Sequence, residues 1–118
     1  MTLKDFYTEI GGDYTGVMRR LPSESFVKRF LNIFTKDSSY FELKNSLEQK
    51  NLEEAFRAAH TLKGVCSNLS LDGLTGPVTE LTEKLRVPGG SLEGSEVLFE
   101  EVTRVYEAII KGISELDP

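Results

Sequence analysis

The sequence predicts an all-α protein, an antiparallel four-helix bundle with short extra helices at its N-terminus. Apolar residues recur at steps of three and four along almost the whole chain, which is the spacing of one face of an α-helix. No segment shows the alternation of a strand, the dipeptides of a hairpin turn, or a repeat of about 20 to 50 residues. Several helices with such stripes, joined by short connections, bury their apolar faces best in an antiparallel bundle.

Two short helices are expected before the bundle. The first has the apolar stripe Leu3, Phe6, Tyr7 and Ile10. It stops at Gly11 and Gly12, because glycine is a favoured residue just after a helix. Asp13 can cap the second helix, which has the stripe Tyr14, Val17, Met18 and Leu21 and ends at Pro22.

The bundle itself is predicted from four main segments: Ser23–Lys36, Ser38–Leu69 as a helical hairpin, Leu71–Arg86 and Ser95–Leu116. The first of them is the most aromatic, and its stripe of Phe26, Phe30 and Phe34 is assigned to the core. In the third, Pro77 predicts a kink near Gly76 or a helix that starts only at Pro77. Proline removes a backbone donor and clashes with the preceding turn.

Length and charge restrict the class of protein. The chain has 118 residues, the size of one domain, so residues 1–118 are treated as a single domain. Its 14 basic and 19 acidic residues give a net charge of −5, so no nucleic-acid partner is expected. It has neither an apolar run long enough for a membrane helix nor a signal-peptide core, which indicates a cytoplasmic protein without a membrane partner. Its only cysteine, Cys66, is expected in the core.

The only histidine, His60, is the leading candidate for chemistry. It lies in a helix whose apolar residues are Leu52, Ala55, Phe56, Ala59, Leu62, Cys66 and Leu69. His60 falls roughly 120° from the centre of this stripe. It therefore shares the polar side with Glu53, Arg57, Gly64 and Ser67 and is expected to face water.

Two residues that follow His60 strengthen this reading. Side chains in a helix lean toward its N-terminus, so Lys63 can bring its ammonium close to the imidazole. Gly64 costs the helix about 1 kcal/mol relative to alanine. It can serve close packing of another helix, but its place on the polar side favours a gap that an approaching partner needs.

These residues resemble the signature of the histidine-containing phosphotransfer (HPt) family, in which lysine and glycine occupy the third and fourth positions after the histidine. The segment His60-Thr61-Leu62-Lys63-Gly64 matches that signature. The resemblance extends from about Gly11 through Leu85 and implies a helical bundle. The chain departs from the family at Ser70, where glycine is frequent.

The resemblance implies a phosphorelay carrier and not an ATP-dependent enzyme. His60 would accept a phosphoryl group from an aspartyl phosphate on a response-regulator receiver domain, and pass it to another receiver or back. Lys63 would stabilise the phosphoryl charge and Gly64 would leave room for the partner. The chain would need no cofactor or metal of its own, because the receiver supplies Mg²⁺. The N-terminal side chains Phe6, Tyr7 and Ile10 are expected to contribute to the docking face.

A hybrid or sensor histidine kinase is also an expected partner. Two alternatives stay open: direct phosphorylation of His60 by the ATP-binding domain of a histidine kinase, as in the chemotaxis kinases, and a helical adaptor whose histidine is incidental. Other chemistries do not fit. A di-iron bundle needs glutamate three residues before the histidine, where Arg57 stands. One histidine and one buried cysteine cannot complete a zinc site. No phosphate-binding glycine loop and no Gly-x-Ser-x-Gly motif occurs.

Overall fold

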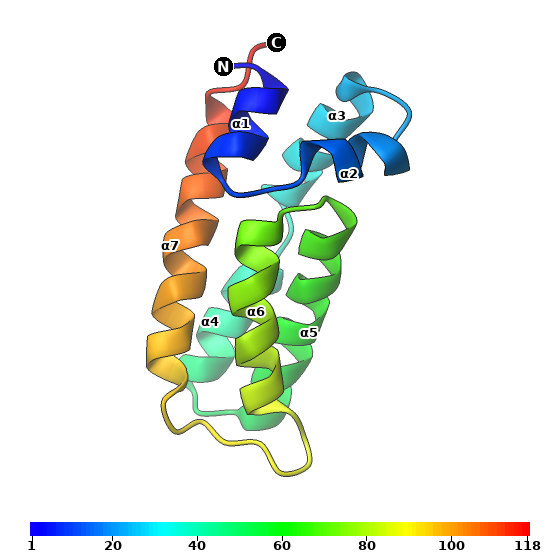
Figure 1. Cartoon of the computed structure of the whole chain (residues 1–118). Coiled ribbons are helices and arrows are strands. Elements are labelled where there is room, and N and C mark those ends of the chain that lie inside the picture. Colours follow the sequence, from blue (N-terminus) through cyan, green and yellow to red (C-terminus); the bar gives the residue numbers. More distant parts are fainter.

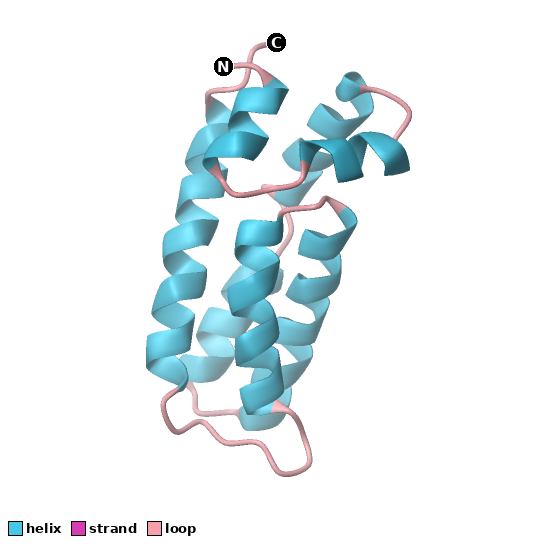
Figure 2. Ribbon diagram, viewed as in Figure 1, coloured by secondary structure: helices cyan, strands magenta, loops and turns pink.

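The computed structural model describes all 118 residues and contains seven helices and no strand (Figure 2). The helices are α1 (Leu3–Glu9), α2 (Tyr14–Arg20), α3 (Glu24–Phe34), α4 (Ser39–Glu48), α5 (Leu52–Asn68), α6 (Asp72–Leu85) and α7 (Ser95–Ser114). The prediction of an all-α protein is confirmed.

The last four helices pack side by side as a helical bundle (Figure 1). Helix α5 packs against α4 and α6, and α6 also packs against α7. Between α4 and α7, the rings of Tyr40 and Tyr106 stack with centroids 4.0 Å apart, and the Tyr40 hydroxyl lies 2.9 Å from that of Thr103. Buried apolar side chains from every helix join in one continuous core.

Helix α3 differs from the prediction for Ser23–Lys36. It lies at the end of the molecule where α1 and α2 lie, and leads into α4, which packs along α5 (Figure 1). The assignment of its whole aromatic stripe to the core is wrong: Phe34 is buried, but Phe26 is 41% and Phe30 38% exposed. The buried face of α3 is Val27, Leu31 and Phe34. Phe26 and Phe30 lie on the adjacent face, about 100° away, which stays partly open to solvent.

Helix α6 also corrects a prediction. It begins at Asp72 and continues through Pro77, so the expected start at Pro77 is wrong. A proline inside a helix costs about 3 kcal/mol. Leu74 and Val78, on either side of Pro77, are fully buried, and each contributes about 1.5 to 3 kcal/mol. Burial of the continuous apolar stripe therefore outweighs the cost of the proline.

The N-terminal helices close the end of the bundle at which α5 ends. The Tyr7 hydroxyl donates a 2.7 Å hydrogen bond to the carbonyl of Leu69, and the Asp13 amide donates one of 2.9 Å to the carbonyl of Ser70. The Arg20 guanidinium donates to the carbonyl of Ser67. These bonds satisfy carbonyl groups that the end of a helix leaves without partners.

The apolar side chains of α1 do not form a docking face. Phe6, Tyr7 and Ile10 are all buried, so the expectation that they meet a partner is wrong. A Cβ atom added at Gly112 would lie 2.8 Å from the Phe6 ring, so α1 packs directly on the backbone of α7. These side chains fill the open end of the core, where a bundle would otherwise expose apolar surface to water.

Candidate functional site

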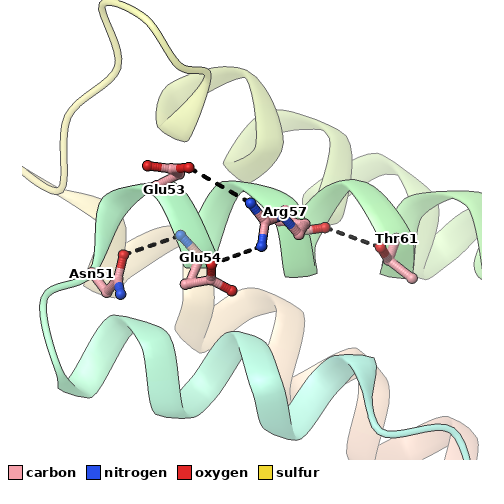
Figure 3. A network of polar contacts seen from close by, with 5 residues as sticks. All are labelled: Asn51, Glu53, Glu54, Arg57 and Thr61. Atoms are coloured by element: carbon pink, nitrogen blue, oxygen red, sulfur yellow. Dashed lines mark hydrogen bonds and ion pairs between the residues drawn. The ribbon is translucent and has the colours of Figure 1, made fainter.

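His60 lies in the middle of α5 and its side chain is exposed, as the helical spacing predicts. The helix begins after Asn51, whose side chain accepts a 3.1 Å hydrogen bond from the Glu54 amide (Figure 3). Residues on the opposite side of α5 enter the core: Ala55, Ala59, Leu62 and Cys66 are buried. The imidazole makes no hydrogen bond or ion pair within the chain, so its nitrogens are free to react.

The imidazole lines a shallow depression between α5 and the end of α6. The residues around it are Glu53, Phe56, Arg57, His60, Thr61, Arg86 and Val87. The Phe56 ring is half-buried, with its centroid 6.1 Å from that of the imidazole. Phe56 therefore forms an apolar wall beside the histidine.

Lys63 is half-buried, one helical turn after His60. It forms no ion pair in the chain, but its charge acts on the carboxylate of Glu83 on α6. Hydrogen bonds from Arg86 lower the pKa of Glu83, and the charges of Arg86 and Lys63 lower it further. Lys63 is therefore a cation without an ion-pair partner, one helical turn after His60.

Gly64 lies in open space. A Cβ atom added there would meet no atom within 4 Å, and the residue is exposed. Close packing of another helix therefore does not explain this glycine. The structure favours the interpretation that Gly64 leaves a gap beside His60.

Two arginines border the depression. Arg57 was placed beside His60 by the helical spacing, and its guanidinium lies 2.7 Å from Glu54 and 3.6 Å from Glu53 (Figure 3). Sequence reasoning missed Arg86, which follows the last residue of α6. Its guanidinium donates hydrogen bonds of 2.9 and 2.6 Å to Glu83 and lies 5.4 Å from the centroid of the Phe56 ring. No local spacing could place Arg86 here, because it comes from another helix.

Cys66, on the same helix, takes no part in the site. It is buried in the core, as expected, and burial raises the pKa of its thiol to about 12. A thiol with so high a pKa stays protonated at neutral pH and is a poor nucleophile. Of these two side chains, α5 presents only His60 to solvent.

A helical bundle that exposes one free imidazole, with an unpaired lysine and a gap beside it, has the features of a protein that carries a group on histidine. A family model described as the Hpt domain matches residues 41–112, more than half of the chain. The chain belongs to the Hpt domain family, whose members are phosphocarriers of two-component phosphorelays.

The matched segment begins in α4, includes all of α5 and α6, and ends in α7. It starts later than the resemblance seen from Gly11 and continues beyond Leu85. No curated protein and no solved structure gave a match. None of the helices combines the length and the apolar character needed to cross a membrane.

Proposed function

We propose that His60 is the phosphoryl-accepting residue of a phosphorelay carrier. It would receive the group from an aspartyl phosphate on a response-regulator receiver domain, and pass it to a second receiver or back. The observation that carries this proposal is that the only histidine of the chain is exposed, has no hydrogen-bond partner and lies inside the segment matched by the Hpt domain model.

The reaction requires a nucleophile, a cation that stabilises the phosphoryl charge, and space for the partner's aspartate beside the histidine. A nitrogen of the neutral imidazole attacks the phosphorus, the P–O bond to the aspartate breaks, and a P–N bond forms. The aspartate leaves as a carboxylate, and the other imidazole nitrogen releases its proton to water. Lys63, which forms no ion pair, would stabilise the charge on the transferring group. Gly64, with open space around it, would let the partner's aspartate approach within about 3 Å.

The scaffold for this chemistry is the bundle of α4 to α7. We infer that these helices form the antiparallel four-helix unit, since short connections at 49–51 and 69–71 join neighbours that pack along their lengths. We propose no cofactor or metal on this chain, with Mg²⁺ supplied by the receiver. The three proposed site residues lie about one helical turn apart on α5: His60, Lys63 and Gly64.

The proposal is tested by offering the chain two donors. One is a set of receiver domains from the same organism, phosphorylated with labelled acetyl phosphate; the other is a histidine kinase, hybrid or sensor, with labelled ATP. We expect transfer from a receiver, giving a phosphate that is labile in acid and stable in alkali. Labelling only by the kinase would favour direct phosphorylation instead.

The variant His60→Gln serves as the control for both donors. Its side chain is exposed, so the fold should be unchanged, which a thermal melt checks. Labelling that persists in folded His60→Gln would contradict the assignment of the acceptor. No labelling of the wild-type chain by any donor would favour an adaptor whose histidine is incidental.

A further inference from the structure

The carboxylate of Glu83 on α6 pairs with Arg86, which lines the depression together with His60. It accepts two hydrogen bonds from Arg86, and the charge of Lys63 also lowers the pKa of this carboxyl group. We propose that Glu83 is a stand-in for the phosphoryl group: it holds Arg86 while His60 is free, and the phosphoryl group on His60 displaces it. This inference rests on the proposed function, since it requires a phosphoryl group on His60.

Arg86 and His60 face the same depression. Phe56 lies beside both of them, with its ring centroid 5.4 Å from the guanidinium carbon and 6.1 Å from the imidazole centroid. At Arg86 the backbone leaves the helical conformation, with φ −54° and ψ 127°. The Arg86 guanidinium lies over the ring of Phe56, which forms the wall of the depression.

The chemistry favours the exchange of partners. A guanidinium binds a phosphoryl group through the same two-pronged arrangement of N–H donors that it uses for a carboxylate. The phosphoryl group carries more negative charge than one carboxylate, about −1.5 to −2 near neutral pH. Since Arg86 and Glu83 are both about half exposed, their ion pair is weak and easily broken.

Arg57 is less suited to this role, although it lines the same depression. Its guanidinium lies between the carboxylates of Glu53 and Glu54, toward the N-terminus of α5 (Figure 3). Two carboxylates hold the guanidinium of Arg57, whereas the guanidinium of Arg86 has one ion-pair partner, Glu83. The phosphoryl group would therefore recruit Arg86 before Arg57.

The exchange would set the lifetime of the phosphohistidine. In hydrolysis, water attacks the phosphorus, the P–N bond breaks, inorganic phosphate leaves and the imidazole takes up a proton. Arg86 bound to the phosphoryl oxygens disfavours that proton and holds the group in place. Glu83 competes for Arg86 and repels the phosphoryl group, so it shortens the lifetime.

The test uses phosphoramidate, which phosphorylates the intact chain without a receiver. Its P–N bond breaks, ammonia leaves and a new P–N bond forms to the imidazole. Decay of the phosphohistidine is followed by ³¹P NMR, with His60→Gln as the blank. We expect Arg86→Gln to shorten the half-life about fivefold and Glu83→Gln to lengthen it by a similar factor.

A second readout separates this role from simple stabilisation of the fold. Titration of the phosphoryl ³¹P shift gives the pKa of the phosphoryl group, which should rise in Arg86→Gln and fall in Glu83→Gln. Loss of an ion pair that only supports α6 would change both variants in the same direction, as weaker thermal stability, and would leave the phosphoryl pKa unchanged.

The chain offers a matched control on α7. Arg104 donates hydrogen bonds of 3.1 and 2.6 Å to Glu101, with the same atoms and the same spacing as Arg86 and Glu83. Neither control residue lines the depression. Arg104→Gln and Glu101→Gln should leave the half-life and the phosphoryl pKa as in the wild type.

Each outcome has one meaning. Half-lives of Arg86→Gln and Glu83→Gln that equal those of the controls overturn the inference and leave the acceptor role of His60 intact. Opposite shifts in the two variants, without transfer from any receiver, support the inference and overturn the proposed relay function. Absence of a phosphohistidine signal that depends on His60 overturns both.

Discussion

The Tyr7 hydroxyl donates a 2.7 Å hydrogen bond to the carbonyl of Leu69, 62 residues away in the sequence. The bond is buried and joins the first helix of the chain to the residue at which α5 ends. It holds the N-terminal helices over the end of the bundle, on the helix that carries His60.

Removal of this hydroxyl should weaken the fold and spare the chemistry. Tyr7→Phe leaves the buried Leu69 carbonyl without its donor, which costs about 1 to 3 kcal/mol. We expect a lower midpoint in urea unfolding and an unchanged rate of phosphoryl transfer. Tyr14→Phe is the control, since the Tyr14 hydroxyl bonds Glu24 at the exposed surface. Equal midpoints for the two variants would show that the Tyr7 bond contributes nothing.

The same tyrosine predicts a dependence on alkaline pH. Burial raises the pKa of the Tyr7 hydroxyl above its ordinary value of 10.0. The unfolded chain loses this proton more readily than the folded chain, so the stabilisation is complete below about pH 10 and falls as the pH rises above it. We expect the stability of the wild type to drop more steeply than that of Tyr7→Phe between about pH 10 and 12. Parallel curves would contradict the prediction.

Ser70 lies in a backbone conformation that suits glycine. Its φ is 52°, it is buried, and its hydroxyl has no hydrogen-bond partner. Ser70→Gly removes both the strain of the left-handed conformation and the unpaired hydroxyl, and should stabilise the protein by about 1 to 2 kcal/mol. Ser70→Ala removes only the hydroxyl and should gain less.

Lys50 provides the comparison for this substitution. Its φ is 55° and it is exposed, so Lys50→Gly relieves the backbone strain alone. Urea unfolding of the three variants separates the two contributions. A Ser70→Gly variant less stable than the wild type would show that the serine fills space the core needs.

Substitutions at Gly64 should affect the stability of the protein and the rate of phosphoryl transfer differently. Because a Cβ atom there meets no other atom, Gly64→Ala should raise the stability of the helix by up to about 1 kcal/mol. Gly64→Gln should keep most of this gain but lean over the His60 ring, and should transfer phosphate poorly. Thermal melts and transfer rates measured on both variants decide the point.

Gly112 is the matched helical glycine. A Cβ atom there would lie 2.8 Å from Phe6, so Gly112→Ala should lower the melting temperature. A Gly64→Gln variant that melts below the wild type and transfers normally would show that Gly64 serves packing and not access.

Lys63 should act in transfer and not in folding. Its ammonium has no ion pair to lose, so Lys63→Ala should keep the thermal stability of the wild type while slowing transfer about five- to tenfold through the lost charge. Rapid-quench measurement of transfer from a phosphorylated receiver checks the rate. Lys111→Ala, at an exposed position on α7, is the control. Equal rates for the two variants would exclude Lys63 from the mechanism.

The helices and the face that carries the candidate site could be predicted from the sequence. Helical periodicity is a local property, because residues three and four apart lie on one side of a helix. That rule is enough to place His60 and Gly64 on the exposed side of α5, opposite a buried stripe, with half-buried Lys63 at the edge of that stripe. It also located α7 and the two short N-terminal helices within a few residues.

Which apolar face is covered, and which residues of other helices reach the site, was decided only by the tertiary structure. Phe26 and Phe30 have the same spacing as core residues, yet both stay partly exposed. Phe6 and Tyr7 are buried because α1 packs against the end of the bundle. Arg86 comes to the depression near His60 through the packing of α6 on α5, and Glu83 is its hydrogen-bond partner. The physical reason is that contacts between helices depend on their relative position in space, which the spacing within one helix does not specify.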